Sequence, residues 1–149
     1  MKTLFDSDAS AEIVQRINKL KPSSPQLWGK MNVAQMLAHC SAGIEMHNGD
    51  IKPPRVFIGR VIGPFFKPLL TNDKPFRKGT PTAPELLIVD ERNFEKEKER
   101  LIGLINRFVR EGREGVTKHP HPFFGKLKED EWGMGAYKHL DHHLQQFGV

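Results

Sequence analysis

Residues 129–147 have the sequence EDEWGMGAYKHLDHHLQQF, and this stretch indicates the class of fold more clearly than any other. It opens with three acidic residues, which the positive end of a helix dipole favours. At roughly 100° per residue, one face of a helix here would carry Trp132, Ala136, His139, His143 and Phe147. Because an apolar helix face is normally buried, the stretch predicts a helix with two inward-facing histidines.

Three other segments have apolar residues at helical spacing, namely residues 8–20, 32–48 and 90–110. In the second segment Asn32 and Gln35 have the spacing of a capping box, which predicts that the helix begins there. In the third, Asp90 is the expected cap. Together with the C-terminal stretch, the sequence predicts four amphipathic helices.

Residues 51–89 separate the second and third predicted helices and contain seven of the 11 prolines. Since proline breaks long helices, we expect a packed crossover with one or two short helical turns. The overall prediction is an all-α protein, a four-helix bundle with a long proline-rich crossover, formed by one domain over residues 1–149. An alternative places Arg55–Leu70 on a membrane surface, but proline interrupts its helical pattern and buried crossovers are equally apolar.

Composition narrows the class of protein and its setting. A chain of 149 residues with 38% hydrophobic residues is typical of a soluble globular domain. The single cysteine, Cys40, cannot form an intrachain disulfide, so we expect a reduced, cytoplasmic setting. The N-terminal residues lack the apolar core of a secretory signal, and no apolar run approaches the ~18 residues of a membrane helix. We therefore expect no membrane partner.

The net charge of +5 is a weak signal for nucleic-acid binding. Basic residues such as Lys96, Lys98 and Arg100 alternate with glutamates, and no basic stripe interleaved with aromatic residues is present. We therefore expect no nucleic-acid partner.

Histidine is concentrated at the C-terminal end, where five of the seven histidines fall within residues 119–149. His139 and His143 are four residues apart, so their rings lie one helical turn apart and can bind one ion. His142 lies off that face. The alternative is a chance pair of buried histidines that bond to carbonyl groups. Leu140 stands where a zincin-type protease has glutamate, so that class of enzyme is disfavoured.

Two histidines are too few for a tight site, and the spacing leaves the third ligand open. In residues 32–48, His47 lies about 40° from the centre of the apolar stripe, whereas His39 lies roughly 120° from it. Periodicity alone therefore favours His47. His119 and His121, in a proline-stiffened loop, are further candidates.

Three motifs occur in an order typical of a known family. They are Trp28 with NVAQMLAH at residues 32–39, HPHPFFG at residues 119–125, and Trp132 with HLDHH at residues 139–143. This arrangement resembles the DinB/YfiT-like metalloenzyme family, with its tryptophan-led second helix, its histidine–proline–aromatic–glycine loop and its ligand pair on the last helix. The resemblance spans nearly the whole chain.

The resemblance implies a divalent metal ion inside a four-helix bundle, bound by His39, His139 and His143, and so favours His39 over His47. Zinc or nickel is the expected ion, with iron as a further option. The family includes transferases that depend on low-molecular-weight thiols. The expected function is therefore that of a metal-dependent enzyme, a thiol-dependent transferase or a hydrolase, acting on a small electrophilic molecule.

No residue stands out as a general base, so no catalytic residue is assigned. Glu45, Asp50, Asp73 and Asp141 are interpreted as surface carboxylates, and Cys40 as a buried, inert thiol. The alternative function is a non-catalytic helical module for interaction or sensing, stabilised by metal. A homodimer is compatible with both functions.

Overall fold

The computed structural model describes residues 2–149. Within this range the chain forms α-helices and short 3-10 helices and no strand, so the expected all-α fold is confirmed. In chain order the elements are α1 (Ser7–Lys19), α2 (Val33–Asn48), α3 (Phe57–Phe66), α4 (Pro68–Thr71), η1 (Pro84–Leu86), α5 (Phe94–Glu111), η2 (Arg113–Gly115) and α6 (Glu129–Gln146). No helix in the described range has both the length and the apolar character needed to cross a bilayer.

Local hydrogen bonds explain where α2 and α5 begin. The side chain of Asn32 accepts from the Gln35 N–H at 2.9 Å, and the Gln35 side chain accepts from the Asn32 N–H at 3.0 Å, which confirms the predicted capping box. The expected cap of α5 at Asp90 is wrong. Asn93 caps this helix by accepting from the Lys96 N–H at 2.9 Å, because it is the last side chain able to do so before the apolar stripe begins.

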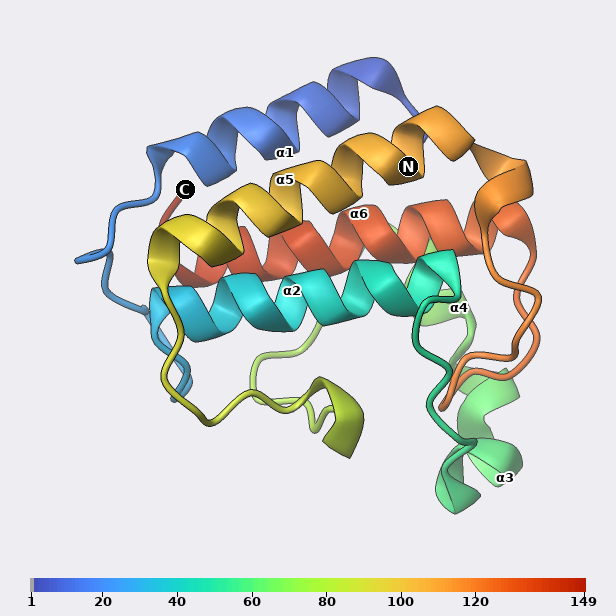
Figure 1. Cartoon of the computed structure of the whole chain (residues 1–149). Coiled ribbons are helices and arrows are strands. Elements are labelled where there is room, and N and C mark those ends of the chain that lie inside the picture. Colours follow the sequence, from blue (N-terminus) through green and yellow to red (C-terminus); the bar gives the residue numbers. More distant parts are fainter. Residues whose placement is uncertain (1) are drawn as a thin grey trace.

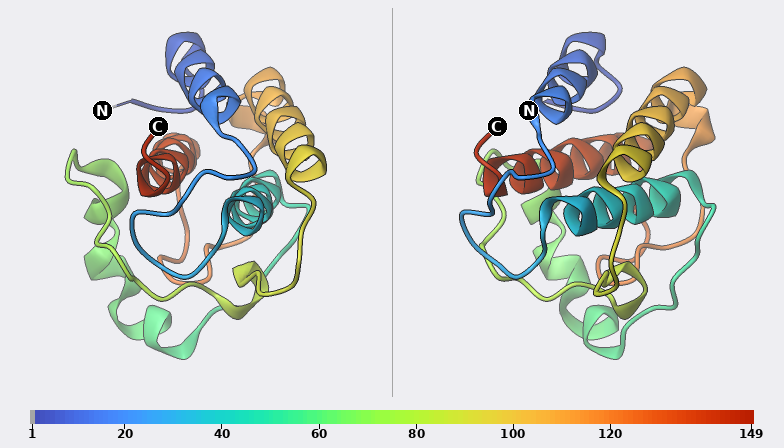
Figure 2. Two further views of the ribbon diagram at one scale, coloured as in Figure 1. Left: turned by 90° about the vertical axis from the view of Figure 1, so that its left-hand side faces the viewer. Right: turned by 60° about the vertical axis from the view of Figure 1, so that its left-hand side comes forward.

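The four long helices α1, α2, α5 and α6 form the body of the molecule. Both α1 and α2 contact α5 and α6 (Figure 1). The end-on view in Figure 2 shows α1 and α5 as one layer over α6 and α2, with the crossover on the opposite side of α2 and α6. Buried apolar side chains from all four helices form the core, among them Ile13, Leu37, Ile105 and Leu140. As a result, α2 is covered on one side by the α1 and α5 layer and on the other by the crossover.

Lys138 attaches the crossover to α6. Its side chain is buried, and its ammonium group donates to the backbone carbonyl of Leu69, to the carbonyl of Asn72 at 3.0 Å and to the Asn72 side chain at 2.9 Å. Carbonyl groups at the end of a helix carry partial negative charge, which a cation stabilises. This lysine therefore holds the end of α4 against α6.

The prediction that the whole crossover is packed is wrong for α3. Phe57 and Phe65 are each 83% exposed, and α3 projects from the body at the lower right of Figure 1. The physical reason is that α3 contacts the loop before α6 through two glycines. A Cβ atom at Gly59 would lie 2.7 Å from Phe123, and one at Gly63 would overlap the Phe123 carbonyl oxygen. Most of its large apolar side chains therefore point away from the body, whereas the ring of Phe66 lies 6.3 Å from that of Phe123.

Candidate metal centre

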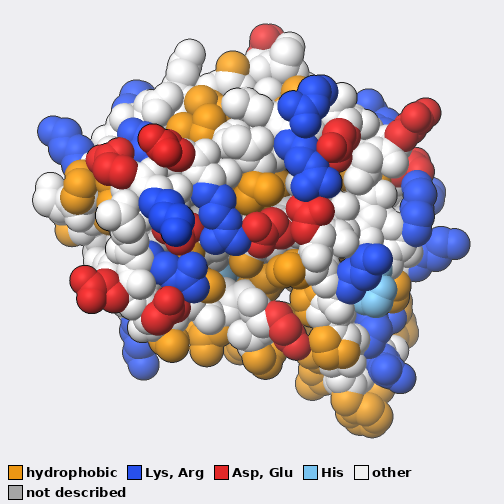
Figure 3. Space-filling model, viewed as in Figure 1, with side chains coloured by type: hydrophobic (Ala, Val, Ile, Leu, Met, Phe, Trp, Pro, Cys, Tyr) orange, Lys and Arg blue, Asp and Glu red, His pale blue; other side chains and the backbone are white. Residues whose placement is uncertain are grey.

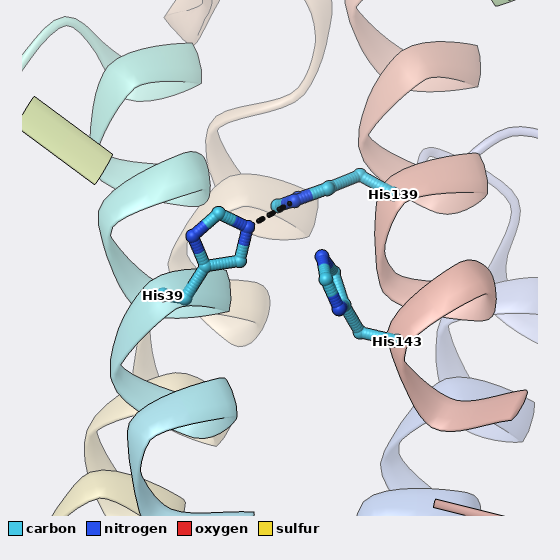
Figure 4. A group of neighbouring side chains, drawn as sticks. All are labelled: His39, His139 and His143. Carbon is cyan, nitrogen blue, oxygen red and sulfur yellow. Dashed lines mark hydrogen bonds between the residues drawn. The ribbon is translucent and has the colours of Figure 1, made fainter. Parts of the chain in front are cut away.

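Three histidines from α2 and α6 converge in the interior between these helices (Figure 4). Their candidate ligand nitrogens all lie within 4.8 Å of one another. The Nε2 atoms of His39 and His139 are 2.9 Å apart. His39 and His143 are buried and His139 is half-buried. The expected convergence of these three rings is therefore present.

The sequence of α6 brings two of the rings together. His139 and His143 are one turn apart, and their ring centroids are separated by 4.8 Å with the rings edge to face. The His39 ring, from α2, lies 4.9 Å from that of His139 and 4.7 Å from that of His143. The contact between α2 and α6 thus completes the cluster.

Hydrogen bonds orient two of the three rings. The Nδ1 of His39 lies 2.7 Å from the carbonyl oxygen of Leu86 in η1. A carbonyl can only accept, so this nitrogen carries the proton and Nε2 keeps its lone pair. The Nδ1 of His143 lies 2.8 Å from the Gln146 side-chain oxygen, while Gln146 donates to the Trp28 carbonyl at 2.7 Å. His143 therefore also presents the lone pair of Nε2 to the cluster.

A glycine in α2 provides the space for the third ring. A Cβ atom at Gly43 would lie 2.9 Å from both Cε1 and Nδ1 of His139, closer than side chains normally approach. Gly43 is one turn beyond His39 on the same helix. The absence of a side chain there lets the His139 ring approach α2 closely and reach His39.

The environment favours neutral imidazoles. Burial lowers the pKa of His39, lowers the pKa of His143 to about 3 and, together with the neighbouring histidines, holds the pKa of His139 well below its usual range. A metal ion binds the neutral form of histidine. At neutral pH the three rings are therefore uncharged. The 2.9 Å contact with the Nε2 lone pair of His39 puts the proton of His139 on its Nε2, and this proton would have to move for that nitrogen to bind an ion.

The three nitrogens fit a divalent ion by their number, type and placement. Zinc–nitrogen bonds are about 2.0–2.1 Å, so two nitrogens on one ion lie no more than roughly 4.2 Å apart. The candidate nitrogens lie within 4.8 Å of one another, so the rings would have to adjust slightly to bind one ion. Among the described residues, the group contains no carboxylate and no thiol, so a bound ion would keep its full positive charge.

His47, the ligand favoured by periodicity, lies outside the cluster. It is buried as predicted, but its Nδ1 bonds to the Gly43 carbonyl and its ring packs edge to face on Trp132 at 4.9 Å. Burial lowers its pKa to about 4. The helical wheel misplaced His39 because it assumes that α2 has one buried face, whereas η1 covers the flank on which His39 lies.

The other histidines have structural contacts. The Nδ1 of His121 accepts from the N–H groups of Phe123 and Phe124 at 3.1 and 3.2 Å, which stabilises the turn before α6. His119 lies 3.2 Å from the Pro53 carbonyl. His142 is half-buried, with its ring 5.7 Å from that of Trp28. None of the three belongs to the cluster that could hold an ion.

The carboxylates of α2 and α6 form ion pairs at the surface of the body. Glu45 pairs with Arg100 at 2.7 Å, Asp50 with Arg107 at 2.7 Å, and Asp141 with Arg16 at 2.7 Å; Asp73 is exposed. Asp141 is not only solvated, because its ion pair with Arg16 links α6 to α1. Cys40 is buried as predicted, and burial raises the pKa of its thiol, which keeps it unreactive.

Sequence reasoning missed two groups that orient the ligands. Gln146 follows His143 by three residues on the same helix face, so its spacing could have indicated the contact. The carbonyl of Leu86 gives no signal in the sequence, because any residue would supply it. Its position depends on how the crossover passes over α2.

Comparison with known proteins identifies the family. The model of the family described as "Protein of unknown function (DUF1569)" matches residues 2–148. Searches among curated proteins and among solved structures gave no match. Since the match spans nearly all of the 149 residues, the chain belongs to the DUF1569 family.

Proposed function

We propose that this protein is a metal-dependent enzyme whose divalent ion is bound by His39, His139 and His143. The observation that carries the proposal is the convergence of three neutral imidazoles, two of them buried and one half-buried, of which His39 and His143 already point their Nε2 lone pairs inward. The ring nitrogens of an isolated buried histidine normally form hydrogen bonds with carbonyl or hydroxyl groups. Metal-binding histidines typically have their outer nitrogen hydrogen-bonded to the protein, and the outer nitrogens of His39 and His143 are bonded in this way.

A divalent ion bound by three neutral ligands retains open positions and lowers the pKa of a thiol or water that coordinates it. The protein's own part is to hold the three rings and to fix the tautomers of His39 and His143 through Leu86 and Gln146. The substrates proposed are a low-molecular-weight thiol or water and a small electrophile. The reaction is thus a thiol-dependent transfer or a hydrolysis.

Zinc or nickel is the preferred ion, and iron is the third option. Imidazole is a ligand of intermediate softness that suits all three. The absence of carboxylates from the cluster disfavours magnesium and calcium, which prefer oxygen ligands.

We further propose that the four long helices constitute the four-helix bundle of the DinB/YfiT-like metalloenzymes. The order of the motifs and the position of the histidine cluster between α2 and α6 support this relationship. The second candidate function is a non-catalytic module in which the ion only stabilises the helices. The burial of the cluster beneath η1 is the observation that favours it.

The test begins with metal-stripped protein titrated with Zn²⁺ or Ni²⁺ by calorimetry. We expect one ion per chain for the wild type, and loss of binding in His39→Ala, His139→Ala and His143→Ala. His142→Ala is the matched control, since it neighbours the cluster but lies outside it. Retained binding in the first three variants would contradict the site, and circular dichroism verifies that each variant is folded.

A second arm distinguishes the two candidate functions. The metal-loaded protein is incubated with a small thiol and an electrophile such as an alkyl halide or epoxide, and loss of free thiol is followed. Turnover that disappears with His139→Ala and persists with His142→Ala is expected for the enzyme. If the ion raises the melting temperature and no thiol or water reaction is accelerated over a panel of electrophiles, the non-catalytic module is correct.

A further inference from the structure

The face of α3 that points away from the body is apolar and exposed. Phe57 and Phe65 are each 83% exposed, Ile58 is 59% exposed and Val61 is 58% exposed. On a helical wheel centred between Gly59 and Gly63, these four residues lie on the opposite side, about 120–180° from that centre. The helix is therefore attached through its glycines and presents its large side chains to solvent.

This exposed face is concentrated in one place. Six of the large hydrophobic residues that are exposed lie between residues 57 and 69, whereas the others are scattered over Leu27, Leu87 and Val89. Figure 3 shows hydrophobic side chains gathered on the projecting part at the lower right. A continuous exposed apolar patch of this kind marks a surface that binds a protein, a membrane or a ligand.

The chain around α3 is basic. Residues 51–72 contain four Lys and Arg residues and no acidic residue, whereas Lys78, later in the crossover, lies over the Trp28 ring beside His142, away from α3. Only one of the four, Lys67, is in an ion pair with a described residue, Glu131 at 2.8 Å. Arg60 lies in α3 itself and is exposed. Figure 3 shows Lys and Arg side chains beside the projecting apolar surface.

We propose that α3 docks on the surface of an anionic phospholipid bilayer. A short helix with large apolar side chains on one face and basic residues at its flanks lies in the interface between headgroups and acyl chains. The apolar residues would enter that interface while Arg60, Lys52 and their neighbours contact the phosphate groups. No described helix can span a bilayer, so the contact is peripheral.

Charge distinguishes this occupant from a second copy of the chain. A twofold interface through α3 would place the same basic segment against itself, because such an interface uses one surface patch on both subunits. Like charges at close range oppose that association. An anionic bilayer offers acyl chains to the apolar residues and phosphate groups to the basic ones. This inference revises the expectation that the protein has no membrane partner.

The experiment is co-sedimentation of the full-length protein with vesicles. Vesicles of phosphatidylcholine and phosphatidylglycerol in a 3:1 ratio are compared with vesicles of pure phosphatidylcholine, at low and at high salt. We expect binding to the anionic vesicles, weaker binding as salt screens the charges, and little binding to neutral vesicles.

Two pairs of variants locate the contact. The double variant Phe57→Ser/Phe65→Ser should lower the partition coefficient at least about tenfold, while Leu27→Ser/Val89→Ser, which removes two exposed apolar residues elsewhere, should leave it unchanged. Arg60→Gln should lower it about fivefold, and Lys30→Gln, an exposed lysine outside the segment, should have no such effect.

Several results would overturn the proposal. Absence of wild-type binding to anionic vesicles would do so without any variant, as would binding that does not depend on lipid charge. A wild-type dimer in analytical ultracentrifugation that dissociates in Phe57→Ser/Phe65→Ser, with no vesicle binding, would show that a second copy covers α3. Because both phenylalanines are exposed, their replacement is not expected to affect folding.

Discussion

At the scale of the residue, the candidate site depends on a glycine as much as on its three histidines. Glycine in a helix interior is destabilising by roughly 1 kcal/mol relative to alanine. Gly43 nevertheless occupies the middle of α2, where a Cβ atom would lie 2.9 Å from the His139 ring. Glycine at this position lowers the stability of the helix, and in return it allows the His139 ring to lie close to His39.

Gly43→Ala should therefore separate stability from metal affinity. The substitution favours the helix but pushes the His139 ring out of its place, so we expect affinity for Zn²⁺ to fall at least about tenfold while the metal-free protein remains as stable as the wild type. Calorimetric titration and chemical denaturation measure the two quantities.

Gly103→Ala is the control for this prediction. Gly103 lies in α5 and is exposed, and a Cβ atom added there would have no neighbouring atom within 4 Å. The substitution should raise the free energy of unfolding by up to about 1 kcal/mol and leave metal affinity unchanged. Equal affinities for Gly43→Ala and the wild type would show that the position of the His139 ring does not matter for binding.

The residues of the site differ in how well the sequence predicts them. His139 and His143 follow from helical periodicity, because residues four apart always share a face. His39 does not, because its burial depends on η1, which is held by contacts distant in sequence. The similarity to a known family suggested His39, whereas the wheel favoured His47, which is buried against Trp132 instead.

At the scale of the element, α3 is attached to the body by backbone rather than by side chains. Gly59 and Gly63 face the backbone of Phe123, and Arg55 donates to the carbonyls of Pro122 at 3.3 Å and Gly59 at 3.0 Å. The loop of residues 121–125 is itself closed by paired backbone bonds between His121 and Gly125. The two glycines thus let the backbone of α3 approach the loop closely, and the Phe66 ring adds a contact with the Phe123 ring at 6.3 Å.

Gly63→Ala should detach this helix. The new methyl group would overlap the Phe123 carbonyl oxygen, so α3 has to move away from the loop. We expect a lower melting temperature and faster tryptic cleavage after Arg55 or Arg60, followed by mass spectrometry, with unchanged metal stoichiometry. Val61→Ala, on the exposed face of α3, should have neither effect; accelerated cleavage in both variants would contradict the proposed packing.

The sequence predicts the long helices well and the crossover poorly, for a physical reason. The long helices α1, α2, α5 and α6 bury one side against the core, so their apolar spacing indicates them directly. The crossover contains several prolines and depends on contacts with loops and glycines. Its apolar residues suggested burial, but in α3 the glycines make the contact and the apolar residues are exposed.

At the scale of the whole molecule, the fold does not depend on the proposed ion. The buried core comprises side chains from all four long helices, and the aromatic residues Phe108 and Trp132 are almost fully buried in it. An apolar core of this size stabilises the helices without an ion. The histidine cluster lies at the edge of that core, between α2, α6 and η1.

Removal of the metal should therefore leave the helices formed. We expect the far-ultraviolet circular dichroism of the chelated protein to match that of the loaded protein. The melting temperature should fall by roughly 10 °C, since an ion at a thousand times its dissociation constant stabilises the native state by about 4 kcal/mol. Collapse to a random coil on chelation would show instead that the ion is required for folding.

The most direct measurement for the central claim is a crystal structure of metal-loaded protein with anomalous diffraction recorded at the absorption edge of the ion. The account predicts one anomalous peak per chain, within about 2.0–2.2 Å of the Nε2 atoms of His39, His139 and His143. A peak beside His47 or His121, or no peak between α2 and α6 in crystals of protein saturated with zinc or nickel, would contradict it.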